Sequence, residues 1–275
     1  MLRETFHIAV PTAFHNDESI NLESTINHIK NLFHQGVKSV LVSGTTGEQH
    51  SLSIREKLQL LDRLQMEVEL MEQMEIIFGV SAVRQKEAEE LARAITKTSI
   101  SGVMIGYPPY IIPTQEEAIA YTKAIIELSD KPTILYNNPN RTGFDLSIES
   151  IIQLSKTKKV IGLKEAGKVE KVPILKSEIK SADFYYYAGG EVNLEQKIEN
   201  GFNRLSSISG NIAPLEIKQW FNKLLHNEEI TKEERDTVET IVENVFQGSF
   251  LVNLKEKISQ QGIPMGICRS PIGNS

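Results

Sequence analysis

Two short runs decide the fold: Pro132-Thr-Ile-Leu-Tyr136 and Val160-Ile-Gly-Leu163, separated by a stretch long enough for a helix. Both runs are apolar on both faces, a pattern typical of parallel strands that helices cover on either side. Six further runs of this kind lie at residues 7–10, 39–42, 75–79, 102–105, 183–188 and 204–208. The alternation of short apolar runs with longer segments indicates an α/β protein with a parallel sheet.

The segments between the runs carry the start and stop signals of helices. Thr114 and Glu117 have the spacing of a capping box, and Gly36 closes the helix whose apolar face begins at Leu22. About eight β–α repeats in ~210 residues predict a TIM (β/α)8 barrel over residues 1–212. A doubly wound open sheet is the alternative, and it is disfavoured because no glycine-rich dinucleotide loop follows the first run.

Residues 213–275 predict a C-terminal helical extension that packs on the barrel and is not a separate folding unit. Its expected helices lie at residues 215–225, 231–246 and 250–261.

The composition excludes several classes of protein. The chain has 275 residues, a formal net charge of −6 and one cysteine, Cys268, which excludes a disulfide framework and a cysteine-built metal site. Its six histidines are dispersed without an HExxH spacing, so we expect surface or packing roles for them and no metal. Scattered Lys and Arg residues argue against a nucleic-acid partner, and no apolar run approaches the ~18 residues of a membrane span. With no signal-peptide pattern at the N-terminus, we expect a soluble cytoplasmic protein.

Polar side chains follow several of the predicted strands, at the end where TIM barrels carry their active sites. In Gly44-Thr-Thr-Gly-Glu48, Thr45 and Thr46 offer hydroxyls and amides to an anion such as a carboxylate, although a plain turn with capping threonines explains them equally well. Tyr136 ends the fifth strand and can pass protons. Arg141 matches a carboxylate or phosphate, or else is a solvated loop residue.

Lys164 gives the sharpest chemical signal. It follows an uninterrupted apolar run and is expected at the last position of its strand, facing the barrel interior. Burial lowers the pKa of a lysine, which frees the amine to attack a carbonyl and form a Schiff base. The alternative is a lysine paired with a buried carboxylate such as Glu165 or Glu48.

Taken together, these segments resemble the dihydrodipicolinate synthase / N-acetylneuraminate lyase family of pyruvate-dependent class I aldolases. The similarity covers nearly the whole chain, and the combination GTTGE, YNxPxRTG and GLKEA at residues 44–48, 136–143 and 162–166 is highly specific. It implies that Lys164 forms an imine with the ketone of pyruvate and that Tyr136 shuttles protons. No dissociable cofactor is implied.

The resemblance also assigns supporting roles. Thr45 links Tyr136 to a second tyrosine, which the family takes from the neighbouring subunit of a tight dimer; Tyr110 is the matching residue and Tyr107 its rival. Thr46 and the amides of the turn that Gly44 begins hold the pyruvate carboxylate. A homodimer, or a tetramer made by doubling it, is therefore implied.

Arg141 favours the dihydrodipicolinate synthase branch, where an arginine receives the carboxylate of L-aspartate-4-semialdehyde, an early step towards lysine. Several departures leave other pyruvate aldolases open, acting on keto-deoxy sugar acids, hydroxy-oxoglutarate or N-acetylneuraminate. Gln49 and His50 follow the GTTGE turn, Gly189-Gly190-Glu191 replaces a GDD pattern, and Ser206 stands where the family has an apolar residue that touches pyruvate. Gly189 and Ser206 complete the set of expected substrate contacts.

Lysine feedback is predicted to be absent. Lysine-inhibited relatives use polar residues at positions that Gln49, Val83 and Pro109 occupy here, and only Glu87 matches. Sensitivity to sub-millimolar lysine in a steady-state assay would refute this.

Two hypotheses of other kinds compete with the aldolase interpretation: a keto-acid sensor and a phosphate-binding barrel. A keto-acid sensor has no need of a nucleophile, so the presence of Lys164 speaks against it. A phosphate site at Gly189-Gly190 is disfavoured because no basic residue stands beside these glycines in the sequence.

Overall fold

The computed structural model describes residues 2–273 and shows a closed barrel of eight parallel strands in sequential order, β1-β2-β3-β4-β5-β6-β7-β8. The strands are β1 Phe6–Ala9, β2 Ser39–Val42, β3 Glu75–Val80, β4 Gly102–Gly106, β5 Thr133–Asn137, β6 Val160–Glu165, β7 Tyr185–Gly189 and β8 Arg204–Ser207. Pairing of β1 with β8 closes the sheet. The TIM barrel prediction is confirmed, and the open-sheet alternative is wrong because a doubly wound sheet has free edges.

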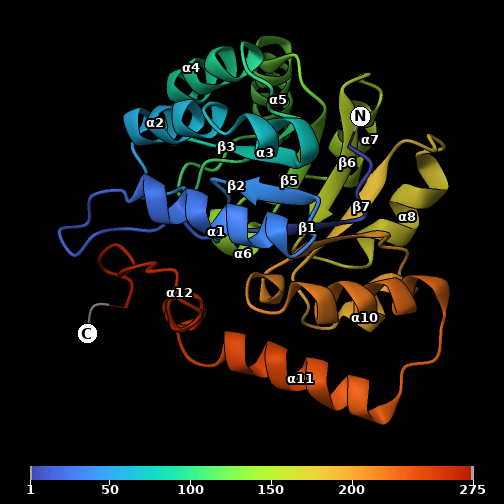
Figure 1. The fold of residues 1–275 in the computed structure, drawn as a ribbon. Helices are drawn as coiled ribbons and strands as arrows, with labels where there is room; N and C mark the ends of the chain where they lie inside the picture. Colours follow the sequence, from blue (N-terminus) through green and yellow to red (C-terminus); the bar gives the residue numbers. More distant parts are fainter. Residues whose placement is uncertain (1, 274–275) are drawn as a thin grey trace.

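Helices surround the strands, as Figure 1 shows. They are α1 Leu22–His34, α2 Ile54–Gln65, α3 Val68–Gln73, α4 Gln85–Thr96, α5 Gln115–Ser129, α6 Pro139–Thr142, α7 Ile148–Ser155, α8 Lys171–Glu178, α9 Leu194–Glu199, the 3-10 turn η1 Ser209–Asn211, α10 Pro214–His226, α11 Lys232–Phe246 and α12 Phe250–Gln260. The predicted capping box is present, since Thr114 Oγ1 accepts from the amide of Glu117 and the Glu117 carboxylate accepts from the amide of Thr114. Gly36, with φ of +84°, follows the end of α1 as predicted.

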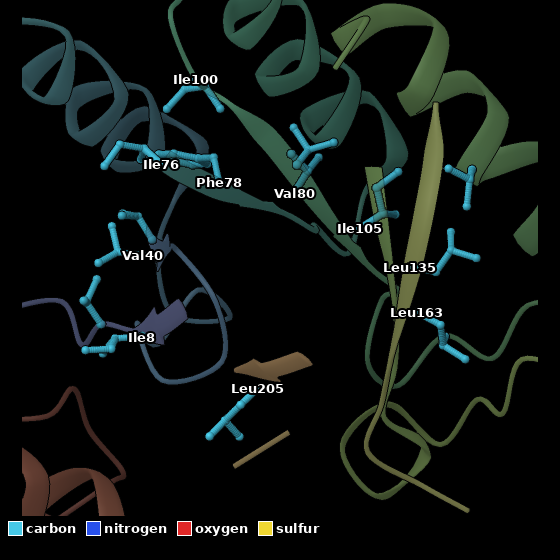
Figure 2. Close-up of a cluster of buried hydrophobic side chains, with 14 of the residues drawn as sticks. Ile8, Val40, Ile76, Phe78, Val80, Ile100, Ile105, Leu135, Leu163 and Leu205 are labelled. Carbon is cyan, nitrogen blue, oxygen red and sulfur yellow. The ribbon is translucent and has the colours of Figure 1, made fainter. Parts of the chain in front are cut away.

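Strand periodicity divides the apolar side chains into two layers. One set points outward and packs under the helices; Figure 2 shows members of it on successive strands, among them Ile8, Phe78 and Leu163. The other set fills the barrel interior, with Leu41 and Met104 among its members. Because successive residues of a strand alternate between the layers, a polar residue at an interior position near the carboxyl end faces the barrel mouth.

The C-terminal helices α10 and α12 extend the hydrophobic packing of the barrel. α10 joins the main core through Ile217 and Phe221, and the Phe221 ring centroid lies 6.5 Å from that of Phe6 on β1. α12 contributes Leu254 and Ile258 to a smaller core that also includes Ala13, from the loop after β1. We propose that the predicted extension, residues 213–275, folds as one unit with the barrel.

Candidate active site

Lys164 lies inside the barrel near the carboxyl end of β6. The strand runs one residue further than predicted, to Glu165, because the amide of Ala166 still bonds the carbonyl of Asn137 on β5. The Lys164 side chain is only 7% exposed and donates a 2.9 Å hydrogen bond from Nζ to Ser206 Oγ on β8. Desolvation lowers the pKa of Lys164, while Tyr136 and Glu191 act in the opposite direction. The net effect favours the free amine that the sequence predicted.

Neither carboxylate named as an alternative partner pairs with this lysine. Glu165 lies next to it on the strand and therefore points to the opposite face, where Asn137 Nδ2 and the amide of Gly167 bond its carboxylate. Glu48 is buried, and it pairs with Lys255 of α12 at 2.5 Å. The interpretation of Lys164 as half of a buried ion pair with Glu165 or Glu48 is therefore wrong.

Tyr136 is the side chain that faces Lys164. The two residues are register partners on β5 and β6, and Lys164 Nζ lies 4.7 Å from the centre of the Tyr136 ring. The phenolic oxygen has two neighbours: Asn138 Nδ2 donates to it at 2.6 Å, and Thr45 Oγ1 lies 3.4 Å away. The contact between Tyr136 and Thr45 was predicted, whereas the contact with Asn138 was not.

The turn after β2 brings Thr45 and Thr46 to the barrel mouth. Ser43 has φ of +55°, and its carbonyl lies against β3 so closely that a Cβ at Gly79 would come within 2.0 Å of Ser43 O. Gly79 is thus required for this turn, a role that sequence reasoning missed because the glycine lies on a different strand. Thr46, in the same turn, is only 4% exposed.

The far end of this turn is held from the C-terminal region. Besides its pairing with Lys255, Glu48 accepts a hydrogen bond at Oε2 from the amide of Arg269. The Arg269 guanidinium bonds the carbonyls of Glu18 and Ser51 and the carboxylate of Glu56. Arg269 therefore holds together the loops after β1 and β2.

A cavity of about 260 Å³ opens beside Tyr136. Its lining consists of Thr45, Gln49, His50, Ser81, Gly106, Tyr107, Pro109, Tyr136, Asn138, Arg141 and Thr142. This combination of hydroxyl, amide, imidazole and guanidinium groups suits a small polar or anionic molecule. His50 had been assigned a surface or packing role, but the structure places it in this lining, where burial lowers its pKa.

Arg141 lies at the mouth of the cavity, on α6. Its guanidinium carbon is 5.8 Å from the centre of the Phe250 ring, and the residue is exposed. A side chain in this position is accessible to an anionic group that enters the cavity.

The two candidate relay tyrosines differ sharply. Tyr110 is 94% exposed, has φ of +71°, and is not among the residues 2–273 that line the cavity of its own chain. Tyr107 is 2% exposed, and its hydroxyl lies 3.1 Å from Thr122 Oγ1. Tyr107 therefore packs within its own chain, whereas Tyr110 is open to solvent.

Gly189 and Ser206 are register neighbours on β7 and β8. A Cβ at Gly189 would lie 3.3 Å from Lys164 Cε, so this glycine gives the lysine its room. No basic residue neighbours Gly189-Gly190 in the sequence, but the fold brings one there: α9 folds back, and Lys197 Nζ donates to the carbonyl of Gly190 at 3.3 Å. Lys197 binds a backbone acceptor there, close to the buried carboxylate of Glu191, and this arrangement does not favour a phosphate.

Within residues 2–273, no helix combines the length and hydrophobicity required to span a bilayer. In the same residues, no three His, Cys, Asp or Glu side chains are grouped in a way that could bind a metal ion.

Comparison with known proteins identifies the family. The model of the dihydrodipicolinate synthetase family matches residues 4–275. The chain belongs to that family. Family membership makes it a lyase of the pyruvate-dependent class I aldolase type, as the resemblance implied.

Individual members of the family are similar along most of their length. The 4-hydroxy-tetrahydrodipicolinate synthase of Oceanobacillus iheyensis is 25% identical over 266 residues, which cover 96% of this chain and 89% of the relative. The synthase of the same name from Fervidobacterium nodosum is 30% identical over 224 residues, covering 81% of this chain and 76% of the relative. A crystal structure of the dihydrodipicolinate synthase of Acinetobacter baumannii, described as complexed with pyruvate, superimposes with a TM-score of 0.86 at 26% identity and covers 98% of this chain and 92% of that one.

Proposed function

We propose that this chain is a 4-hydroxy-tetrahydrodipicolinate synthase, which condenses pyruvate with L-aspartate-4-semialdehyde through an imine on Lys164. The observation that carries the proposal is the buried amine of Lys164 beside the Tyr136 ring, at the carboxyl end of a closed barrel. The names of the relatives support the choice of reaction.

Imine formation needs a free amine and a proton donor. The nitrogen of Lys164 attacks C2 of pyruvate, a C–N bond forms, and the carbonyl oxygen takes a proton to become a hydroxyl. Tyr136 supplies the proton that lets this hydroxyl leave as water, giving a protonated imine. The positive imine nitrogen then accepts the electron pair of a C3–H bond, Tyr136 takes the released proton, and an enamine results.

The enamine is the nucleophile of the second half-reaction. Its C3 attacks the aldehyde carbon, a C–C bond forms, and the aldehyde oxygen takes the proton that Tyr136 removed from C3 to become a hydroxyl. The amino group of the acceptor then displaces Lys164 from the imine carbon and closes a ring, so that one water is lost overall. Arg141 is proposed to hold the acceptor carboxylate by a bidentate contact.

The turn after β2 is proposed to hold pyruvate during both steps. Thr46 is buried in the same turn as Thr45, whose hydroxyl lies 3.4 Å from that of Tyr136, and the hydroxyls and amides of this turn are a group of donors that matches a carboxylate. Gly189 and Ser206 border the lysine on its other side and are proposed to contact the methyl end of pyruvate.

A second copy of the chain is proposed to complete the site. Tyr110 is exposed on its own subunit, together with the neighbouring apolar side chains Ile111 and Ile112. Mixing two inactive variants tests this: Lys164→Ala and Tyr110→Phe subunits, when refolded together, form mixed dimers in which one site has both groups. Recovered activity supports the shared site, and mixtures no more active than the separate variants contradict it.

An assay of aldehyde acceptors tests the proposed reaction. Pyruvate consumption is measured with L-aspartate-4-semialdehyde, and retro-aldol release of pyruvate is measured from 2-keto-3-deoxygluconate, 4-hydroxy-2-oxoglutarate and N-acetylneuraminate. The proposal expects kcat/KM to be at least about a hundredfold higher for L-aspartate-4-semialdehyde. Preference for another substrate would assign a different aldolase activity, and no turnover of any substrate would favour a sensor.

A further inference from the structure

Asn138 makes the shortest contact to the phenolic oxygen of Tyr136. Its Nδ2 lies 2.6 Å from that oxygen, whereas Thr45 Oγ1 lies 3.4 Å away. The first distance is that of a strong hydrogen bond and the second is at the limit of a weak one. In the described structure, Asn138 is therefore the principal partner of the Tyr136 hydroxyl.

The backbone offers Asn138 a different use of its side chain. Asn138 is the N-cap of α6, a position where an asparagine side chain usually accepts a hydrogen bond from an amide of the first turn. Here the side chain makes no such capping bond and turns to the phenol instead. The contact with Tyr136 therefore replaces a capping hydrogen bond that would have stabilised the start of α6.

The chemistry of the amide fixes the direction of this bond. An amide nitrogen is a donor only, so the Tyr136 oxygen must accept. The single hydrogen of the phenol is then free to point elsewhere, towards Thr45 Oγ1 or towards a bound molecule. A donor at this distance also stabilises negative charge on the oxygen after the proton has left.

We infer that Asn138 is a positioning residue, which aims the Tyr136 hydrogen into the cavity and stabilises the phenolate formed after proton transfer. The inference rests on the proposed function, because it assumes that Tyr136 moves protons. In this positioning role Asn138 acts through the Tyr136 hydroxyl.

Other charged or titratable groups lie around Tyr136. Lys164 of β6 lies over its ring, and Arg141 of α6, His50 of the loop after β2 and Tyr107 line the same cavity. All of these groups remain in place when Asn138 alone is replaced, so a change in pH dependence reports the lost donor.

The test is the exchange of the pyruvate methyl hydrogens with deuterium from D₂O, followed by NMR at a series of pD values. This exchange requires the imine and Tyr136 but no aldehyde. Asn138→Leu removes the donor with little change of size, and Asn138→Asp keeps the shape but replaces the donor with a carboxylate. Asn140→Leu, an exposed asparagine on the same short helix, is the matched control.

The inference predicts slower exchange by about tenfold in Asn138→Leu, with the pD midpoint of the profile moved upward by about one unit. The midpoint moves upward whether Tyr136 acts as an acid or as a base, because loss of the Asn138 donor makes the phenolate harder to form in both roles. Asn138→Asp should move the midpoint further, and Asn140→Leu should leave it in place.

Unchanged midpoints in both Asn138 variants would overturn the inference, even if the rates fall, since a merely structural asparagine changes rate without changing the profile. If Asn138→Leu does not fold, Asn138→Asp decides by the same criterion. Failure of the proposed function is distinguished separately, because the unaltered protein would then show no exchange at any pD.

Discussion

Lys164 and Tyr136 are register partners on neighbouring strands, and the lysine amine lies 4.7 Å from the centre of the tyrosine ring. Both side chains are interior residues of a closed barrel, so their separation is fixed by the hydrogen bonds of the sheet and does not depend on a flexible loop. In the proposed roles of nucleophile and proton carrier, two groups held this way need little reorganisation before reaction.

Replacing Ser206 should change the pH dependence of imine formation. Ser206 Oγ accepts a hydrogen bond from Lys164 Nζ, and such an acceptor stabilises the ammonium form. Desolvation already lowers the lysine pKa, and Ser206→Ala should lower it further. The free amine is the reactive species, so the acid limb of the imine-formation profile should move to lower pH. Ser206→Thr, which keeps the hydroxyl, should retain the original limb, and a shift to higher pH in Ser206→Ala contradicts the assignment.

Arg141→Ala should affect the acceptor and spare pyruvate. Loss of a charge-assisted contact costs about 1.5–3 kcal/mol, so kcat/KM for L-aspartate-4-semialdehyde should fall by about ten- to a hundredfold. Exchange of the pyruvate methyl hydrogens should stay within about twofold of the unaltered protein, because the acceptor takes no part in it. An equal loss in both assays would place Arg141 at pyruvate.

The Lys255–Glu48 pair should be important for stability. Both side chains are almost fully buried, at 2% and 0% exposure, so removing one partner leaves an isolated charge in the interior. Lys255→Met should lower the free energy of unfolding by about 3–5 kcal/mol in urea titrations. Lys159→Met, which breaks an exposed pair with Asp130, is the control and should cost about 1 kcal/mol or less.

A double variant sharpens this prediction. Lys255→Met combined with Glu48→Leu removes both charges and should recover a large part of the lost stability. A double variant that is no more stable than Lys255→Met would show that packing, and not the unpaired charge, causes the loss.

His7 should make the protein less stable in mild acid. Burial, with Lys164 nearby, lowers the pKa of His7 from 6.5 to about 3. Below pH 6.5 the unfolded chain takes up a proton that the folded chain refuses, so stability present at neutral pH is lost as the pH falls. The free energy of unfolding should decrease by about 1.4 kcal/mol per pH unit from this group.

The variant His7→Leu measures that contribution. Between pH 7 and pH 5, its free energy of unfolding should fall by about 2 kcal/mol less than that of the unaltered protein. Equal losses in the two proteins would mean that folding does not lower the pKa of His7. His28, whose pKa burial lowers to about 4, remains in both proteins and adds the same slope to each.

The sequence was sufficient for the fold because strands covered on both sides leave continuous apolar runs, and the eight predicted runs match the eight strands to within a few residues. The positions of Lys164, Tyr136 and Thr45 at or just beyond the carboxyl ends of strands were also predictable, because polar residues that follow an apolar run stand out. The contact between Thr45 and Tyr136 followed from the family resemblance, and the structure brings them to 3.4 Å.

Other contacts left no readable signal in the sequence. Asn138 is an ordinary helix-cap residue by its position, and only the three-dimensional structure shows its side chain turned to Tyr136. Glu48 and Lys255 are more than two hundred residues apart, so nothing local predicts their pairing. Lys197 reaches Gly190 because a short helix folds back on the strand end, a geometry that the spacing of residues does not reveal.

Reductive trapping tests the central claim most directly. The protein is mixed with pyruvate and sodium borohydride, its intact mass is measured, and the modified peptide is mapped. We predict one reduced pyruvate adduct per chain, located on Lys164 and lost in Lys164→Ala but kept in Lys168→Ala, which alters the nearby loop lysine. An adduct on another lysine, or none in the unaltered protein, would contradict the account.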